Sequence, residues 1–460
     1  MTAPIAASAS APLAPGPRGW PIVGNLPGMV RDRLGFVSGL QREYGEIFRV
    51  RVGGRELNLL SNPEFIKHVL VDNAANYVKG DIFKKLEPFL GKGLFTAEGD
   101  LWRRQRRLMQ PHFHKESVAA LVGLMVETIA ASIERWRPRA RSGEAFDFAP
   151  EMMRLTLDVV TRALFGADVD ADATTVGAAL TTVLEHTNRR LLSLVDLTDV
   201  LPLPSARRYR RALATLDRIV FGIIAARRRT SERRADLLQM LLDARDPDSG
   251  EPMNDQQLRD EVMTLFLAGH ETTANGLAWT WYLLSRAPAV DRRLRSDVAR
   301  VLGARRPTMD DVPQLAYARQ IFEEAMRLYP PVIGVPRDAI REDRIGGYRV
   351  RAGATVVSSA YLTHHNPRLW PNPEGFDPDR FAPDRPGPPI APFAYLPFGA
   401  GQRKCIGHVF ATIEGTLAVA MIAQAYRPEL VPGVRVDAIP QLTLRPSQIP
   451  IRLRLAEPIQ

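Results

Sequence analysis

Apolar residues recur at helical spacing along most of this chain, and the pattern predicts a mainly α-helical protein. The clearest helical patterns cover residues 33–44, 118–242, 315–328 and 409–425. Residues 255–286 are apolar on nearly every face, which is typical of a helix buried inside a domain. At 1.5 Å per residue such a helix spans about 45 Å, enough to cross the domain.

A small β-rich portion interrupts the helical pattern. Residues 46–52 and 56–60 flank the pair Gly53-Gly54, which predicts a hairpin, and residues 355–360 predict a further strand. Residues 366–395 are aperiodic and rich in proline, so we expect a long coil there. The connection 201–204 is apolar and breaks the helical pattern.

The chain shows no linker, internal repeat or low-complexity block after Pro17, so residues 18–460 are expected to form one domain. Residues 1–17 are rich in alanine, proline and serine and are expected to be a disordered tail. They lack the basic and apolar regions of a signal peptide or membrane anchor. We therefore expect a cytoplasmic monomer with no membrane anchor.

The 460 residues carry a formal net charge of +10, much of it in arginine clusters such as Arg207-Arg208 and Arg227-Arg228-Arg229. Basic surfaces bind nucleic acids or acidic redox proteins. No nucleic-acid-binding motif accompanies the clusters, so we interpret them mainly as solvated helix faces and expect no nucleic-acid partner.

The middle of the predicted buried helix, residues 268–273, is unusually polar for a core. A glycine, an acid and two threonines lower helix propensity and bring polar groups into an apolar interior. Gly269 leaves room for a small molecule, and the Thr272 hydroxyl can bond to a carbonyl one turn earlier and open the helix. A zinc-protease pattern H-E-x-x-H begins at His270, but Ala274 replaces its second histidine.

Cys405 is the only cysteine, which excludes an intramolecular disulfide and suits a reducing compartment. It directly precedes an apolar helical pattern, where free N–H groups and the helix dipole stabilise a thiolate. Gly399 and Gly401 let the backbone approach a flat group closely, and Arg403 adds positive charge. Such a thiolate can be the sole protein ligand of a haem iron, whereas a lone cysteine is by default a small buried hydrophobe.

These two stretches resemble the cytochrome P-450 family. The haem-thiolate loop F-x-x-G-x-R-x-C-x-G is matched at every fixed position by Phe398, Gly401, Arg403, Cys405 and Gly407. Residues 268–273 match the whole oxygen-activation motif A-G-x-E-T-T. The resemblance covers the chain from about residue 15 and implies the cytochrome P-450 fold, mainly α-helical with a small β-rich portion around a buried haem b.

The resemblance also implies roles for individual residues. Cys405 would be the axial ligand of the haem iron, while Thr272 and Glu271 would serve oxygen activation and proton supply, beside Gly269 and Ala268. Further haem-binding positions are implied at Phe398, Gly399, Gly401, Arg403, Gly407, Trp102, Arg106 and Arg337.

Trp102 and Arg106 lie four residues apart on a predicted helix that Asp100 can cap. Alone, they would be a half-buried tryptophan and a solvated arginine; beside a haem, the indole and guanidinium would bind its propionates. His112 and His114 lack a third metal ligand, and His364 and His365 are interpreted as loop residues that form hydrogen bonds.

Glu324 and Arg327 alone would be an ordinary surface pair worth at most about 0.5 kcal/mol, but the resemblance implies a buried structural pair braced by Arg380. It implies that residues 201–204 join two lid helices. It also implies an apolar substrate pocket lined by Phe83, Leu86, Phe89, Leu94, Phe95, Val332, Ile333 and Val335.

The function implied is that of a soluble, bacterial-type haem-thiolate monooxygenase. It would insert one oxygen atom from O2 into a hydrophobic terpenoid, steroid, fatty acid or polyketide, by hydroxylation or epoxidation. The chain has no GxGxxG unit or cysteine cluster, so electrons from NAD(P)H would arrive indirectly, through a ferredoxin or flavodoxin and its reductase, near Arg403 and Lys404. Alternatives are a peroxide-driven or isomerising haem-thiolate enzyme and a non-catalytic haem or ligand-binding protein; Glu271 and Thr272 argue against both.

Overall fold

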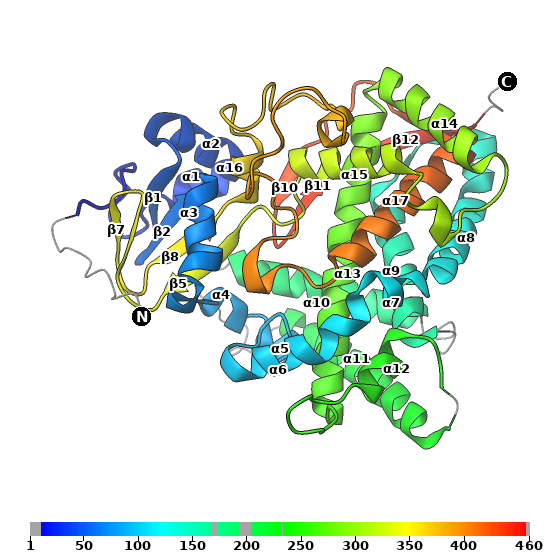
Figure 1. Cartoon of the computed structure of the whole chain (residues 1–460), viewed down its shortest axis with the longest axis horizontal. Coiled ribbons are helices and arrows are strands. Elements are labelled where there is room, and N and C mark those ends of the chain that lie inside the picture. The colour runs from blue at the N-terminus through cyan, green and yellow to red at the C-terminus, as the bar shows by residue number, and fades with distance from the viewer. Residues whose placement is uncertain (1–10, 167–172, 193–203, 232, 457–460) are drawn as a thin grey trace. The chain divides into compact units, whose positions relative to one another are not determined.

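The computed structural model (Figure 1) describes residues 11–166, 173–192, 204–231 and 233–456. Its contacts divide the chain into two compact units. The first unit comprises residues 1–81, 326–375 and 384–405, and the second comprises residues 82–325, 376–383 and 406–460. Residues 1–10 of the expected tail and 201–203 of the expected lid connection lie outside the described residues.

The first unit is built on a five-stranded sheet in the order β1-β2-β8-β5-β3. Its strands are β1 (Ile47–Val52), β2 (Arg55–Leu60), β8 (Thr355–Ser358), β5 (Val335–Ala339) and β3 (Tyr77–Val78). β1 and β2 form the predicted antiparallel hairpin, and β2 pairs in parallel with β8. A separate ribbon consists of β6 (Asp343–Ile345) and β7 (Tyr348–Val350).

Alternation along β1 determines which face of this sheet is covered. Phe48 and Val50 are buried, while Arg51, the residue after Val50, is exposed. Neighbouring side chains of a strand point to opposite faces, so this difference is expected for a period of two. Val37 and Leu40 of α2 (Arg33–Tyr44) pack against the buried pair. The other helices of this unit are α1 (Leu26–Arg31), α3 (Pro63–Lys67), the π-helix η1 (His68–Asp72), and the short η2 (Ala74–Asn76), η7 (Gly401–Arg403) and α16 (Ala360–His364).

Two sequence predictions need correction in the first unit. The expected disordered tail does not extend to Pro17, because Ala14 is buried and the carbonyls of Pro12 and Pro15 accept hydrogen bonds from the N–H groups of Arg349 and Arg49 at 2.8 Å. The strand expected over 355–360 ends at Ser358. There the next side chain, a serine hydroxyl, accepts from a backbone N–H and caps α16.

The second unit is helical around α13 (Asp255–Leu284), which is buried along most of its 30 residues, as the sequence predicted. α13 packs most extensively against α9 (Ala149–Phe165) and also contacts α11 (Pro204–Arg229) and α17 (His408–Ala425) (Figure 1). Its N-terminus is capped by the side chain of Asn254, which accepts from Gln257 N–H at 2.8 Å.

The remaining elements complete this helical unit. The long helices are α6 (Gly99–Met109), α8 (Val122–Ser142), α10 (Ala173–Leu192), α12 (Leu237–Asp243) and α14 (Pro288–Leu302); α15 (Ala316–Leu328) and α4 (Asp81–Lys84) cross the boundary between the units. Short helices are α5 (Glu87–Leu90), α7 (Lys115–Ala119), η3 (Gln110–Phe113), η5 (Met309–Asp311) and η6 (Pro378–Phe381). Two small sheets contain β4 (Phe146–Asp147), β12 (Pro450–Leu455) and β9 (Tyr426–Leu430), and β10 (Ala438–Pro440) with β11 (Leu444–Pro446).

The arginine clusters are only partly solvated. Arg207 and Arg208 are exposed, as expected, but Arg227 is buried and bonds both carboxylate oxygens of Asp236, at 2.6 and 3.1 Å. Pairing of this kind lets a guanidinium enter the interior. Among the described residues only α17 is long and apolar enough to cross a membrane, and 67% of it is buried, which is typical of a core helix.

Candidate active site

The cysteine loop in the first unit depends on glycine geometry. Gly401 adopts φ +69°, and a Cβ there would lie 2.1 Å from the carbonyl oxygen of Leu70, so only glycine fits. The N–H of Cys405 donates to the carbonyl of Phe398 at 2.9 Å and closes the loop. Cys405 is exposed, three residues before α17 begins, so the alternative of a buried structural cysteine is wrong.

A buried histidine supports the chain that leads into this loop. Nε2 of His364 accepts the N–H of Leu396 at 2.8 Å, and Nδ1 donates to the carbonyl of Arg327 at 3.1 Å. Burial, reinforced by the charges of His365 and Arg327, lowers the pKa of His364 to about 3, so the ring is neutral with its proton on Nδ1. The sequence predicted that His364 forms hydrogen bonds within a loop. His364 does form hydrogen bonds, but it is the last residue of the helix α16.

Arg327 forms a second support in the first unit. It is fully buried and donates to the carbonyls of His364 at 2.9 Å, Pro373 at 2.7 Å and Gly375 at 2.9 Å. These bonds fix the start of the proline-rich coil, whose carbonyls would otherwise be buried without donors.

Glu324, in the second unit, is likewise fully buried. One carboxylate oxygen accepts from Nε of Arg380 at 3.2 Å and from the N–H of Asp377 at 3.0 Å. The alternative of an ordinary surface ion pair for Glu324 and Arg327 is therefore wrong, because both side chains are in the interior.

The polar centre of α13 opens onto free space. The hydroxyl of Thr272 donates to the carbonyl of Ala268 at 2.6 Å, one turn earlier, as the sequence predicted. Ala268 is exposed and Thr272 is partly exposed, although the helix around them is buried. The sequence predicted that Gly269 leaves room for a small molecule. The structure differs, because a Cβ at this position would lie 3.0 Å from the Val160 side chain on α9. This glycine therefore serves helix packing.

Glu271 lies on the buried side of the same turn. Its Oε1 accepts from the hydroxyl of Thr443 at 2.6 Å, and that hydroxyl accepts from Nδ2 of Asn275 at 2.9 Å. Burial raises the pKa of the Glu271 carboxyl, while the hydrogen bond from Thr443 and the charge of Arg445 act in the opposite direction. The sequence analysis missed Thr443, since no local pattern links a turn residue to a helix 172 residues earlier.

His270 faces the other way, toward α9. Its carbonyl accepts from the Thr156 hydroxyl at 2.9 Å, and burial lowers the pKa of its ring to about 4. The described residues contain no group of three or more histidine, cysteine, aspartate or glutamate side chains that could hold a metal ion.

The expected propionate ligands belong to both units. On α6, Trp102 is buried and Nε of the half-buried Arg106 donates to Gln110 at 3.0 Å. Asp100 does not cap this helix as expected. It lies within the first turn and pairs with Arg103. Arg337 of the first unit is buried on β5.

The expected pocket residues differ in accessibility. Leu86, Phe89 and Leu94 are buried in the packing of the second unit, whereas Phe83 and Phe95 stay partly exposed with their ring centroids 5.4 Å apart. In the first unit, the expected pocket residues are all partly or fully exposed: Val332, Ile333 and Val335.

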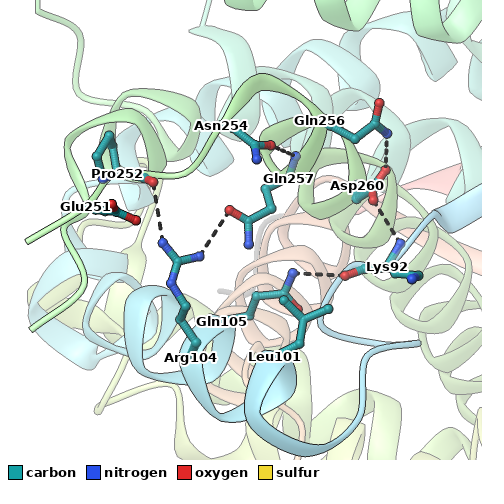
Figure 2. Close-up of a pocket in the computed structure, with 10 residues that line it drawn as sticks. All are labelled: Lys92, Leu101, Arg104, Gln105, Glu251, Pro252, Asn254, Gln256, Gln257 and Asp260. Atoms are coloured by element: carbon teal, nitrogen blue, oxygen red, sulfur yellow. Dashed lines mark hydrogen bonds between the residues drawn. The ribbon is translucent and has the colours of Figure 1, made fainter. Parts of the chain in front are cut away.

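A separate cavity of about 580 Å³ lies in the second unit and is lined mainly by polar and charged residue types (Figure 2). Its lining residues are Lys92, Leu101, Arg104, Gln105, Glu251, Pro252, Asn254, Gln256, Gln257 and Asp260. Charged and amide groups on nearly all sides do not suit an apolar substrate. This cavity is therefore distinct from the expected substrate pocket.

The cysteine loop of the first unit fits a flat prosthetic group held by one thiolate, because Cys405 is exposed in a glycine loop that admits close approach. In the second unit, Ala268 is exposed and Thr272 is partly exposed on an otherwise buried helix. A single soft sulfur ligand suits a haem iron, which needs one axial protein ligand.

Comparisons with known proteins agree with this donor set. A family model described as Cytochrome P450 matches residues 14–452. Cyclooctatin synthase of Streptomyces melanosporofaciens is 38% identical over 430 residues, covering 93% of this chain and 92% of the relative. Cyclooctat-9-en-7-ol 5-monooxygenase of the same organism is 37% identical over 415 residues, covering 90% and 89%.

Two further proteins are similar over almost their whole length. Pentalenene oxygenase of Streptomyces avermitilis is 33% identical over 442 residues, covering 96% of this chain and 97% of the relative. Among solved structures, the haem domain of cytochrome P450DA matches with a TM-score of 0.88 and 28% identity, covering 97% of this chain and 99% of that chain.

Proposed function

Because the chain belongs to the cytochrome P450 family, has its fold and is a monooxygenase of that family, we propose that it inserts one oxygen atom from O2 into a terpenoid. The observation that carries this proposal is the exposed Cys405 in a glycine loop that matches the haem-thiolate pattern throughout. The reaction would be a hydroxylation or an epoxidation.

Cys405 would hold the iron of haem b through its thiolate. When bound, the haem supplies the redox centre at which O2 is activated. Glycine at 401 keeps the backbone close to Leu70, and the Cys405 N–H bond to Phe398 holds the loop closed around the exposed Cys405. Trp102, Arg106 and Arg337 are proposed to bind the propionates, because indole N–H and guanidinium groups pair with carboxylates.

Thr272 and Glu271 are proposed to handle dioxygen and protons. The Thr272 hydroxyl already bonds the carbonyl of Ala268, so its oxygen is left as an acceptor at the accessible face of α13. Glu271 is a buried acid with a raised pKa, a property typical of groups that transfer protons near neutral pH.

The terpenoid class is supported by the relatives. The matched proteins include a cyclooctat-9-en-7-ol 5-monooxygenase and a pentalenene oxygenase. Apolar side chains at Phe83, Phe95 and Val332 are accessible and would contact such a molecule. Steroids, fatty acids and polyketides are the other classes to be screened.

Electrons are proposed to come from NAD(P)H through a separate ferredoxin or flavodoxin and its reductase. Lys404 is exposed beside Arg403 and would attract an acidic donor. A monomer in the cytoplasm is proposed as the working form, and the single cysteine of the chain, Cys405, suits a reducing compartment.

A terpenoid screen that follows the haem absorption shift on binding tests the substrate class. Turnover of a bound compound with NADPH and surrogate redox partners tests the reaction, and hydrogen peroxide alone tests the peroxide-driven alternative. Thr272→Ala should then consume electrons with little product, because O2 reduction is uncoupled. Unchanged coupling in this variant contradicts the role of Thr272, and absence of product with every donor contradicts the monooxygenase proposal.

A further inference from the structure

The turn between β10 and β11 delivers one side chain to the polar centre of α13. Thr443 is 4% exposed, and its hydroxyl lies between two α13 side chains, Glu271 and Asn275, which are 3% and 1% exposed. No motif of the chain includes this residue, and it lies outside the turn of α13 that matches the oxygen-activation pattern.

We propose that Thr443 is a positioning residue that fixes the conformation of the Glu271 carboxyl group. The proposal rests on the proposed function, in which Glu271 supplies protons, and it adds a residue on which that supply depends. Thr443 acts through Glu271 and is not itself assigned a contact with substrate or haem.

Donor and acceptor roles in this network follow from the chemistry of the groups. The Asn275 amide nitrogen can only donate, so its bond of 2.9 Å uses a lone pair of the Thr443 oxygen. The hydroxyl proton of Thr443 is then directed to Glu271 Oε1, 2.6 Å away. Glu271 Oε1 is thereby committed as an acceptor, and a proton carried by this acid must be on Oε2.

Oε2 of Glu271 has no hydrogen-bond partner within the described part of the chain. Burying a carboxyl oxygen without a hydrogen-bond partner costs free energy relative to water, unless the oxygen carries a proton or meets a bound molecule. The network therefore holds one oxygen still and leaves the other available for proton transfer.

The position of Thr443 is itself determined by the hairpin. β10 and β11 pair in antiparallel register, and the N–H of Gln441 donates to the carbonyl of Thr443 at 3.0 Å. On α13, Nε1 of Trp279 donates to the carbonyl of Leu444 at 3.0 Å. The turn is thus held to the same helix that carries Glu271. This keeps the Thr443 hydroxyl within hydrogen-bond distance of the Glu271 carboxyl.

Charged groups around Glu271 come from the hairpin. Arg445 of β11 is the charged residue whose field favours the ionised carboxyl, and the Thr443 hydrogen bond acts in the same direction. His270, next to Glu271 on α13, is neutral and faces α9. Loss of the Thr443 hydroxyl should therefore raise the pKa of Glu271 further and free its side chain to rotate.

The test replaces Thr443 by Val, which keeps the shape and removes the hydroxyl, and by Ser, which restores it. The infrared band of the Glu271 carboxyl is identified by its loss in Glu271→Gln, and its titration is followed with pH. The midpoint should move to higher pH in T443V and return to its natural value in T443S. Product formed per NADPH should fall at least about threefold in T443V, the order expected for loss of one hydrogen bond, and recover in T443S. The pH dependence of coupling should shift with the infrared titration.

Thr280→Val is the matched control, since Thr280 is a fully buried α13 hydroxyl that donates only to the carbonyl of Gly276, at 2.8 Å. Asn275→Leu is a second variant that keeps the Thr443 hydroxyl but removes the donor that orients it; it should shift the titration in the same direction. A carboxyl titration unchanged in T443V, or changed equally in T280V, overturns the proposal.

Failure of the proposed function gives a different result. If Glu271→Gln leaves coupling unchanged, Glu271 is not the proton source. The infrared titration still decides whether Thr443 positions the carboxyl, because that measurement does not depend on turnover.

Discussion

The N–H of Leu396 donates to Nε2 of His364 at 2.8 Å, so a histidine 32 residues earlier holds the chain just before Phe398. The same ring donates to the backbone carbonyl of Arg327, and the guanidinium of Arg327 donates to the backbone carbonyl of His364. The two residues therefore bond reciprocally in the interior of the first unit.

Replacing His364 by Ala should destabilise the protein by about 3 kcal/mol, because it removes the acceptor of the buried Leu396 N–H and a donor to the Arg327 carbonyl, and opens a cavity. Urea unfolding measures this loss. The matched control is His114→Ala, which removes an exposed histidine and should change stability by less than about 0.5 kcal/mol. Equal effects of the two substitutions would show that the His364 bonds do not support the fold.

Stability should fall as the pH drops below about 6.5, the ordinary pKa of histidine. In the folded protein the pKa of His364 is lowered to about 3 and that of His270 to about 4, both chiefly by burial. The unfolded chain therefore binds protons between these values and 6.5 while the folded chain does not, which favours unfolding. The stability contributed by neutral burial is complete above pH 6.5 and is lost progressively toward pH 4.

The measurement is the free energy of unfolding from pH 8 to pH 4.5, compared between the natural sequence and His270→Met. The variant should show a shallower loss between pH 6.5 and 4.5, since it lacks one buried histidine that takes up a proton on unfolding. Parallel curves would mean that His270 is already protonated or exposed in the folded state.

The buried pair of Glu324 and Arg380 should be costly to break. Arg380→Leu removes a guanidinium partner from the fully buried Glu324 carboxylate, and the expected loss is about 3–5 kcal/mol. The control is Arg293→Leu, which breaks a pair with Asp379 that is about half exposed and 2.7 Å long, and should cost at most about 1 kcal/mol. Glu324→Gln together with Arg380→Leu should recover part of the loss, and no recovery would contradict an electrostatic cause.

Two neighbouring acids on α13 hold the segment that precedes Phe95. Asp260 accepts the N–H of Lys92 at 2.8 Å (Figure 2), and Glu261 accepts the N–H of Leu94 at 2.9 Å. A Cβ on Gly93 would lie 2.2 Å from the Thr264 hydroxyl, so the backbone rests directly on the helix.

Glu261→Ala should release this segment. Amide exchange at Leu94 should accelerate at least about tenfold, because a buried charge-assisted hydrogen bond is lost, and trypsin should cleave faster after Lys92, which is exposed. The control is Glu251→Ala, which removes an exposed acid from the lining of the polar cavity that also contains Lys92. This substitution should leave both rates unchanged. Equal protection of Leu94 in both variants would show that Glu261 does not hold the segment.

Local patterns were sufficient for the elements that depend on neighbouring residues. The P-450 fold that the family resemblance implied is confirmed. The β1–β2 hairpin, α2, α13 and α17 are confirmed as well, because their sequence patterns lie within each segment. The bond from Thr272 to Ala268 was also predictable, since the two residues are one turn apart.

Features that depend on distant partners were not predictable. Residues 11–17 carry no periodic pattern, yet Ala14 enters the core because backbone donors of Arg49 and Arg349 meet the proline carbonyls. Gly269 was assigned to a ligand, whereas its partner is Val160 on another helix. Thr443 had no signal at all, because its role depends on the placement of a turn beside α13. The single-domain organisation and the residue roles in the site stay predictions.

The account depends most on a bond between the sulfur of Cys405 and a haem iron. The direct measurement is the absorption spectrum of the purified, reduced protein with carbon monoxide, beside Cys405→His as the matched variant. The natural sequence is expected to give the band typical of thiolate-bound haem. The Cys405→His variant is expected to give the spectrum typical of histidine-bound haem instead. A colourless natural protein, or one that already gives the histidine-type spectrum, would contradict the account.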